Sequence, residues 1–329
     1  MNQRTADNPH TFTRRGAFRF LHWGDLLREP AVEWLVEGHL PAGGLTTLTG
    51  PANSYKTFLA LDLALSVITG EPWHGRNVVS GPVVYVAAEG HTGAVRQRIQ
   101  AWLDAHAPSD PDGLAYVPGP VNLMRPEETV EFLQEAEPMR PRLIIIDTLA
   151  RCMVGGDENS ARDVGQVLDH IGLIQRRTGA AVLVVHHSGH NQTRERGSSA
   201  LRAAVDTAVQ VGANGLGVSL ACKKQKDAEP FADVHLRPEH QSGSLILRPM
   251  PAGSSAAQDR WNKTISVLHD AEDSLSGGQL QSLVGGNAGD NRTMWRKMED
   301  DPECPVSRKD KRWTLDRQRI PVANAASDD

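Results

Sequence analysis

The chain has 329 residues, of which 39% are hydrophobic and 23% are charged, and its formal net charge is −5 at pH 7. This length suits one large α/β domain with a smaller one, and the acidic balance means that any binding to nucleic acid must use local basic surfaces. Cys152, Cys222 and Cys304 are too few and too widely spaced for a disulfide framework or a zinc module. No apolar run approaches the roughly 20 residues of a membrane span, so we expect a cytoplasmic protein with reduced thiols and no membrane partner.

The composition changes along the chain predict five segments. Residues 1–17 are polar and are expected to form a flexible tail, as are residues 320–329. The main domain is expected to span residues 18–250, where apolar residues at mixed helical spacing up to Glu37 predict a lead-in that packs on its core. Residues 251–258 are rich in Ser, Gly and Ala and read as a linker, which leaves residues 259–319 as a second domain.

The first predicted strand runs into a loop with a phosphate-binding pattern. A β-rich run ends at Gly50, and an apolar helical stretch resumes after Lys56 and Thr57. This is the strand, loop and helix context of a P-loop, in which Tyr55 takes the place of the second glycine of the motif. Lys56 would reach the β- and γ-phosphates of ATP, and the Thr57 hydroxyl would hold Mg²⁺. The alternative is an ordinary turn with a chance Lys-Thr pair. The residues expected to bind the nucleotide are Gly50, Pro51, Ala52, Asn53, Ser54, Tyr55, Lys56, Thr57 and Phe58, together with His186.

Strands and helices alternate after this loop. Such alternation predicts a parallel sheet with helices on both faces, and ligands of such sheets bind at the carboxyl ends of the strands. Arg96 and Arg98 fall on the polar side of the predicted helix at residues 93–105. The predicted strands are residues 83–88, 142–147 and 180–185, and the predicted helices are residues 93–105, 127–137 and 160–177.

Two carboxylates stand at predicted strand ends. Asp147 ends an aliphatic run and is expected to orient the water ligands of Mg²⁺ as a Walker B carboxylate, although a strand-end Asp can also be a simple turn former. Glu89 ends the strand that we expect beside the P-loop strand, where it would accept the proton of the attacking water. A solvated loop glutamate is the alternative.

Two histidines follow the next predicted strand. His186 and His187 would hydrogen-bond the γ-phosphate and report its presence. The alternatives are a structural histidine pair, or a metal site shared with His190 and Asp157.

Past Gly197, a short helix over residues 199–206 and four short β-segments predict antiparallel additions to the sheet. The polar stretch 191–202 would contact a DNA backbone or form a solvated loop. The basic stretch 223–227 follows a strand and, in a ring of subunits, would reach a neighbour's γ-phosphate; in a monomer it is only a charged turn. The cations considered for these roles are Arg194, Arg196, Arg202, Lys224 and Lys226.

The second domain carries three predicted helices, over residues 261–271, 276–283 and 291–298, and then a basic hairpin over residues 306–315. We expect Asn291 to cap the third helix. This order resembles a winged helix with a recognition helix at 291–298 and a wing at 308–312, although such modules also dock proteins. The candidates for contact with duplex DNA are Arg292, Arg296, Lys297, Arg308, Lys309, Lys311 and Arg312.

Four motifs, at residues 50–57, 87–90, 144–147 and 184–187, resemble in this order the RecA-type ATPases, and in particular the RepA-like hexameric helicases of plasmids and phages. The likeness spans about residues 20–250, and RepA-like relatives also carry a tyrosine at the position of Tyr55. It implies an α/β RecA-like P-loop core with Lys56 and Thr57 for ATP and Mg²⁺, Glu89 as base, Asp147 for Mg²⁺, and His187 or His186 as sensor.

The same resemblance implies a homo-oligomeric, hexameric ring that acts as a replicative DNA helicase or replication ATPase on single-stranded DNA. Two other functions remain open. One is a recombination or repair ATPase that forms filaments on DNA, and the other is a DNA-binding regulator that is switched by its nucleotide.

Overall fold

The computed structural model describes residues 21–29, 31–108, 112–187, 199–214, 217–250, 260–261, 263–265, 267–268, 271, 274–301 and 304–316. Contacts between Cα atoms divide the chain into residues 1–33 and residues 34–329. Within the described part of the chain, no helix has the length and apolar character needed to cross a membrane.

The predicted lead-in, with its mixed helical spacing, is helical over only a few of its described residues. Its described residues contain one short helix, α1 (Trp23–Leu26), whose cap is the His22 side chain. Trp34–Val36 instead forms strand β1, which pairs with β2 (Leu40–Pro41). Gly38 makes this turn possible because its φ of +68° lies in the left-handed region. Val36 is fully buried, so the prediction of packing on the core is confirmed for this strand.

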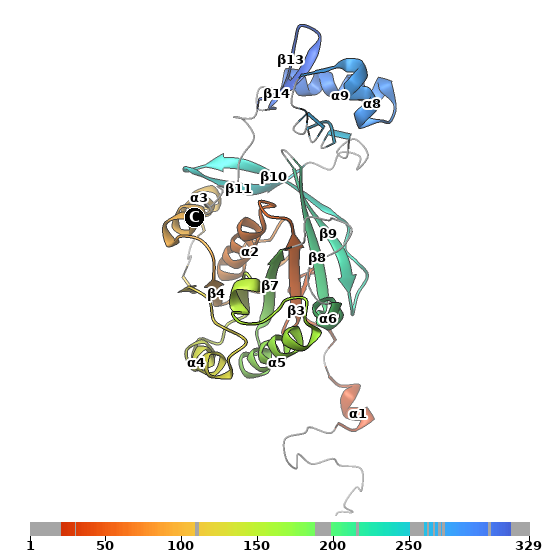
Figure 1. Cartoon of the computed structure of the whole chain (residues 1–329). Helices are drawn as coiled ribbons and strands as arrows, with labels where there is room; N and C mark the ends of the chain where they lie inside the picture. Colours follow the sequence, from red (N-terminus) through yellow and green to blue (C-terminus); the bar gives the residue numbers. More distant parts are fainter. Residues whose placement is uncertain are drawn as a thin grey trace, which may run out of the picture. The chain divides into compact units, whose positions relative to one another are not determined.

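A nine-stranded sheet, in the order β11-β10-β9-β8-β3-β7-β6-β4-β5, forms the centre of the second unit in its described residues (Figure 1). Strands β8 to β5 of this order are parallel, and β9, β10 and β11 add to them in antiparallel fashion, as predicted for these three segments. The same prediction is wrong for β8, which pairs in parallel with β3, because the chain between β7 and β8 is long enough for a parallel crossover. The strands are β3 (Leu45–Gly50), β4 (Val83–Ala87), β5 (Leu114–Pro118), β6 (Leu143–Asp147), β7 (Ala181–His187), β8 (Thr207–Asn214), β9 (Gly217–Gln225), β10 (Val234–Gln241) and β11 (Ser244–Pro249).

One predicted neighbour relation is wrong. Strand β4, which leads to Glu89, lies between β6 and β5, so that β6 and β7 separate it from the P-loop strand β3. The prediction followed chain order, but a helical crossover is long enough to carry the next parallel strand past intervening positions. The later strands β6 and β7 then fill the gap between β3 and β4.

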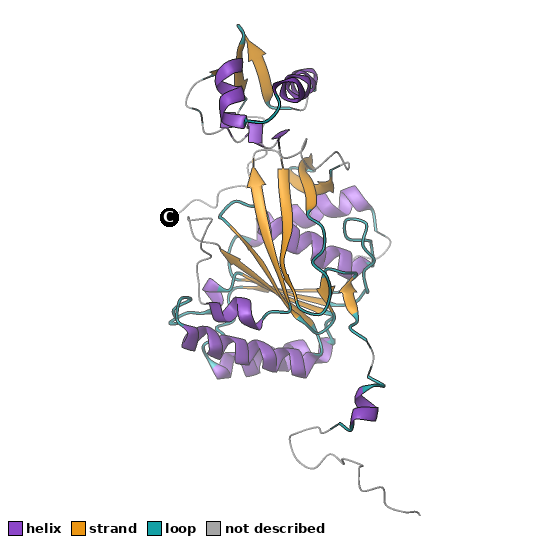
Figure 2. Cartoon of the chain, turned by 90° about the vertical axis from the view of Figure 1, so that its right-hand side faces the viewer, coloured by secondary structure: helices purple, strands orange, loops and turns teal. Residues whose placement is uncertain are grey.

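Helices cover both faces of the sheet, as Figure 2 shows. Helices α2 (Lys56–Thr69) and α3 (Thr92–His106) share one hydrophobic cluster, and α4 (Pro126–Ala136) and α5 (Ala161–Thr178) share the other. The predicted bounds of α3, α4 and α5 are confirmed to within one residue. Shorter elements are the 3₁₀ helices η1 (Glu137–Met139) and η2 (Ala150–Cys152) and the helix α6 (Ser199–Ala204).

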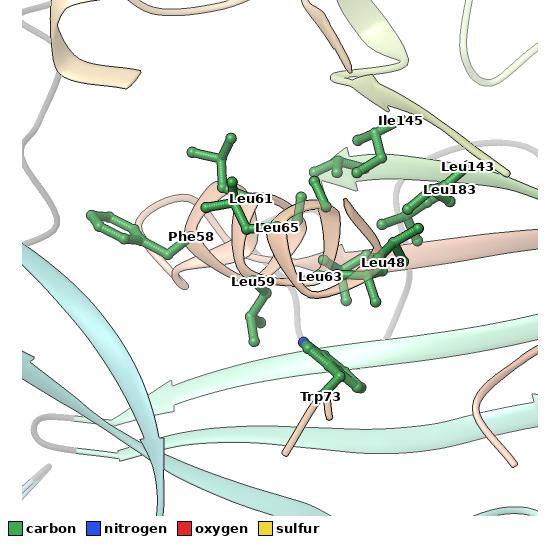
Figure 3. Close-up of a cluster of buried hydrophobic side chains, with 14 of the residues drawn as sticks. Leu48, Phe58, Leu59, Leu61, Leu63, Leu65, Trp73, Leu143, Ile145 and Leu183 are labelled. Atoms are coloured by element: carbon green, nitrogen blue, oxygen red, sulfur yellow. The ribbon is translucent and has the colours of Figure 1, made fainter. Parts of the chain in front are cut away.

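Helix α2 is apolar on nearly all sides because it is buried between the sheet and its neighbours. Leu59, Leu61, Leu63 and Leu65 are each 3% exposed or less, and Figure 3 shows them radiating from the helix toward surrounding core side chains. A helix buried all round loses the one-sided apolar pattern of a surface helix. The residues at its first turn are thereby held rigidly at the carboxyl end of β3.

A buried carboxylate ties α2 to α3. Asp62 accepts hydrogen bonds from the indole N–H groups of Trp73 at Oδ2 and Trp102 at Oδ1, each at 2.8 Å. His74 Nε2 also lies 2.9 Å from Oδ2. These donors offset the desolvation of a carboxylate inside an apolar helix. The contact with Trp102 fixes α3 against the helix that begins at the P-loop.

Residues 260–316, called the C-terminal module below, have a hydrophobic cluster of their own. Their described parts include helical residues at 260–261, 263–265 and 267–268, the helices α8 (Gly277–Val284) and α9 (Ala288–Asp300), and a sheet in the order β12-β14-β13. The strands are β12 (Leu275–Ser276), β13 (Val306–Lys309) and β14 (Arg312–Leu315). The predicted hairpin is confirmed, with both turn residues, Asp310 and Lys311, at positive φ, as a type I′ turn requires.

Helix α9 begins earlier than predicted, and Asn291 does not cap it. The Asn287 side chain accepts from the backbone N–H groups of Gly289 at 2.8 Å and Asp290 at 3.2 Å. Asn291 lies inside the helix, fully buried, and its amide donates to Gln281 Oε1 at 3.0 Å. Both asparagines are good caps by type, and only packing against α8 decides between them.

Candidate nucleotide site

The loop after β3 has the backbone of a P-loop although Tyr55 replaces a glycine. Tyr55 adopts φ 67° and ψ 16° immediately before α2, the left-handed conformation that glycine takes most easily. Its ring is 6% exposed and its centroid lies 5.9 Å from that of Phe58. The ring belongs to the hydrophobic core, and burial raises its pKa to about 12. The tyrosine therefore supplies the required backbone turn while its ring packs with the core.

Gly50 is required by close packing at the end of β3. A Cβ atom added there would lie 2.6 Å from the Val211 carbonyl oxygen and 2.8 Å from Ser54 Oγ. Both distances are shorter than a carbon atom can accept. The loop can fold this tightly only with glycine at its first position.

Lys56 places its ammonium group inside the loop. Lys56 Nζ donates to the Pro51 carbonyl oxygen at 2.6 Å and lies 3.4 Å from Ser54 Oγ. Burial lowers its pKa to about 8, and the negative charges of Asp147 and Glu89 oppose this shift. At pH 7 the protonated form still outnumbers the neutral form by roughly ten to one, so a cation stands at the centre of the loop.

Asp147 ends β6 as predicted and is 4% exposed. It accepts a 2.6 Å hydrogen bond from the Tyr85 hydroxyl at Oδ2, and the Thr57 side chain also hydrogen-bonds to it. Burial raises the pKa of Asp147, whereas both hydrogen bonds and the charge of Lys56 oppose that rise. The structure thus brings together the two predicted magnesium ligands.

Glu89 reaches the same edge of the sheet from the loop after β4. Thr148 Oγ1, which follows Asp147, donates to Glu89 Oε1 at 2.9 Å. His187 Nε2 and Arg151 Nε each lie 3.9 Å from its carboxylate oxygens. His187 is the largest cause that holds the pKa of Glu89 below its ordinary value, followed by Thr148. Of these three partners, Thr148 alone lies within hydrogen-bond length of Glu89, because 3.9 Å exceeds that length. Because the pKa of Glu89 is lowered, its carboxylate is an ionised acceptor at neutral pH.

The two histidines occupy the last two positions of β7 and point to opposite sides of the strand. His186 is 4% exposed and lies opposite Thr49 of β3. His187 is half-buried and faces Glu89. Of the two predicted sensors, His187 is therefore the one beside the candidate base.

Sequence reasoning missed several residues at this edge. Arg98, assigned to the polar side of its helix, has its guanidinium 4.4 Å from the centroid of the Phe58 ring, and burial is the main cause that lowers its pKa. Tyr85, Thr148 and Arg151 contact Asp147 or Glu89 as described above. The one available signal was Tyr85, a hydroxyl in an otherwise aliphatic strand.

The basic candidates of the main domain have mixed outcomes. Arg194 and Arg196 lie outside the described residues. Lys224 was predicted to follow a strand, but it lies within β9. Its Nζ donates to the carbonyl oxygens of Arg202 and Ala203 at 3.1 and 2.8 Å. Lys226 Nζ lies 3.4 Å from Asp206 Oδ1. These two lysines are engaged within their own chain.

The seven cations predicted to contact duplex DNA in the C-terminal module are all exposed. Arg292, Arg296 and Arg308 line one hollow with Trp295 and the first turn of α8. The guanidinium of Arg308 lies 5.5 Å from the centroid of the Trp313 ring, across the β13–β14 pair. Elsewhere in the module, Lys297 lies on α9, Lys309 and Lys311 lie at the hairpin tip, and Arg312 Nε donates to Ser274 Oγ at 2.8 Å.

The residues at the edge of the sheet fit a magnesium nucleotide. The hydroxyl of Thr57 and the carboxylate of Asp147 are the hard oxygen donors that Mg²⁺ prefers. Backbone N–H groups at the start of α2 and the ammonium of Lys56 suit a polyphosphate. Among the described residues, no group of three or more His, Cys, Asp or Glu side chains is arranged to hold a metal ion, and His190 lies outside them.

Two comparisons with known proteins found similarities to this chain. A solved KaiC-like protein from the hyperthermophilic archaeon Pyrococcus horikoshii OT3 is 14% identical, with a TM-score of 0.47, over 65% of this chain and 94% of that chain. A sequence family described as an AAA domain matches residues 13–193. The parallel sheet, the P-loop and α2 form a RecA-like P-loop NTPase core. Because the family match spans more than half of the chain, the protein belongs to the AAA domain family of P-loop ATPases.

Proposed function

We propose that the protein hydrolyses ATP with Mg²⁺ and uses this reaction on DNA, as a RepA-like replicative helicase or replication ATPase. The observation that carries the hydrolytic part is the convergence of Lys56, Thr57, Asp147 and Glu89 at one edge of the sheet, from three different strand ends. The charges of Asp147 and Glu89 raise the pKa of Lys56, and the charges of Glu89 and Lys56 act in opposite directions on the pKa of Asp147.

Each residue has a chemical task in this proposal. Lys56 exchanges the Pro51 carbonyl oxygen for phosphate oxygens, and Thr57 and Asp147 hold the metal. Mg²⁺, when bound, neutralises charge on the phosphates. Glu89 accepts the proton of the attacking water as a general base, and the hydrogen bond from Thr148 orients its Oε1 atom. His187 Nε2 lies 3.9 Å from the other carboxylate oxygen of Glu89, which supports a role for His187 as the sensor of γ-phosphate loss.

We further propose a homo-oligomeric ring in which a basic residue of one subunit reaches the nucleotide of the next. If Lys224 or Lys226 is that basic residue, it has to leave its present partner within its own chain to reach the neighbouring nucleotide. The contact of Lys224 with the last carbonyl groups of α6 is favourable. Formation of the subunit interface would therefore have to replace it with a stronger contact, such as one to phosphate.

The decisive measurement is the rate of ATP hydrolysis with and without single-stranded DNA, together with the mass of the assembly. We expect DNA to stimulate hydrolysis severalfold, since a translocating motor must couple ATP hydrolysis to movement along DNA. We expect the assembly to be a closed ring of about six subunits. Filaments on DNA without strand displacement would favour the recombination or repair ATPase. Slow hydrolysis that DNA does not change would favour the nucleotide-switched regulator.

We propose that the C-terminal module is a winged helix that binds duplex DNA. The order of a helical segment, β12, α8, α9 and the β13–β14 hairpin supports this, as does the pairing of β12 with β14 beside the hairpin. In such modules the helix before the hairpin enters the major groove. The exposed Arg292 and Arg296 of α9 and Arg308 of β13 line the same hollow, which suits phosphate contact.

Replacement of Arg296 and Arg308 together by alanine is expected to weaken duplex binding uniformly across sequences and to reduce the slope of log affinity against log salt by about 2, one unit for each lost phosphate contact. Fluorescence anisotropy at several salt concentrations measures both. The matched control is Arg237→Ala on β10, which removes an exposed arginine outside the module. An unchanged salt slope in the double variant would mean that the module docks a protein instead.

A further inference from the structure

The geometry points to Tyr85 as a positioning residue: its hydroxyl fixes the Asp147 carboxylate in the orientation from which that carboxylate binds Mg²⁺. This inference rests on the proposed function because it takes Asp147 as a magnesium ligand. It assigns a task to a residue in the middle of a core strand that none of the four motifs of the chain includes.

Sheet register explains how a core residue reaches the site. In the parallel pair of β4 and β6, Tyr85 lies opposite Ile145 and Ala87 lies opposite Asp147. Ile145 and Asp147 are two residues apart, so their side chains leave the same face of the sheet, and two residues of a parallel strand span about 6.6 Å. A side chain at position 85 must therefore run along the sheet toward its carboxyl edge to meet Asp147, and tyrosine carries a hydroxyl at that distance.

The contact itself is strong and sheltered. Tyr85 is 1% exposed, Asp147 is 4% exposed, and the Oη–Oδ2 distance is 2.6 Å. Low local polarity strengthens a hydrogen bond inside the protein. The Thr57 hydroxyl approaches the same carboxylate from the first turn of α2. Asp147 is thus held between a donor from β4 and the second candidate ligand of the metal.

Packing alone does not require the hydroxyl. The Tyr85 ring stacks on that of Tyr116 in β5, with centroids 6.2 Å apart and planes inclined by 20°. A phenylalanine would preserve this stacking and the surrounding core. The hydroxyl therefore serves Asp147, and partners that orient a metal ligand typically contribute about 10-fold to 100-fold to metal affinity or activity.

The test is the variant Tyr85→Phe, examined by equilibrium binding of a fluorescent ADP analogue while Mg²⁺ is titrated. We expect the Mg²⁺ concentration for half-maximal enhancement of binding to rise about 10-fold or more. Binding of the analogue in EDTA should equal that of the wild type, because the phosphate loop is untouched. The matched control is Tyr116→Phe, the same change in the adjacent strand, which should leave the Mg²⁺ dependence unchanged.

The outcomes separate the inference from the function on which it rests. If the wild type binds the analogue with no dependence on Mg²⁺, the proposed function fails and the inference fails with it. If the wild type depends on Mg²⁺ and Tyr85→Phe has the same half-maximal concentration, only the inference is overturned. Urea unfolding of both variants completes the test: a loss of stability without a change in Mg²⁺ dependence would show that the hydrogen bond only supports the fold.

Discussion

Replacing Lys56 with alanine is expected to lower the rate of ATP hydrolysis by at least about 100-fold to 1,000-fold, the loss that follows removal of one preorganised donor to developing charge. Lys56 is the cation at the centre of the loop, bonded to Pro51 and Ser54, and within this site it alone can place an ammonium group on the β- and γ-phosphates. Steady-state phosphate release with saturating Mg²⁺ and ATP measures the effect.

The matched control for this change is Lys263→Ala, which removes an exposed lysine of the C-terminal module. It should hydrolyse ATP at the wild-type rate in the absence of DNA. Hydrolysis by Lys56→Ala at the wild-type rate would contradict the assignment of the P-loop.

The same lysine has a cost for the nucleotide-free fold. Its pKa of about 8 lies below the ordinary value because burial disfavours the charged form. Below pH 8 the folded protein carries this buried charge, and the unfavourable contribution disappears as the pH rises from about 8 toward the ordinary value of about 10.4. Lys56→Met should therefore be at least as stable as the wild type toward urea at pH 7, with a smaller difference at pH 10.

Replacing Glu89 with glutamine is expected to reduce hydrolysis by about 100-fold to 10,000-fold, the usual contribution of a general base. Glutamine keeps the size of the side chain and can still accept the Thr148 hydrogen bond at its amide oxygen, but it cannot take a proton from water. Binding of a fluorescent ATP analogue should remain close to that of the wild type. A pre-steady-state measurement of phosphate release separates the chemical step from binding.

The control for Glu89→Gln is Glu135→Gln, the same change on the exposed side of α4. That variant should match the wild type in both measurements. If Glu89→Gln lowers nucleotide affinity and leaves the hydrolysis rate unchanged, Glu89 serves to bind the nucleotide and another group accepts the proton.

The local part of the site could be predicted from the sequence. Gly50, Lys56 and Thr57 occur at fixed spacing between an apolar strand and an apolar helix, and Asp147 directly ends an aliphatic run. These signals depend only on neighbouring residues, because strand and helix periodicity and the chemistry of a phosphate loop are short-range properties. For the same reason the bounds of α3, α4 and α5 could be predicted closely.

The tertiary structure decided everything that depends on which strands become neighbours. Pairing between distant segments is set by the packing of the whole sheet, so chain order wrongly placed β4 beside β3. That packing brings Glu89 to Thr148, directs Tyr85 to Asp147 and lays Arg98 over Phe58. The same packing explains how Tyr55 can stand in place of the second glycine of the motif. Burial of its ring in the core offsets the cost of the left-handed backbone, which tyrosine disfavours. Residue type and local spacing thus predicted the groups proposed to bind the nucleotide and its metal, whereas long-range packing brought in the residues that hold those groups in place.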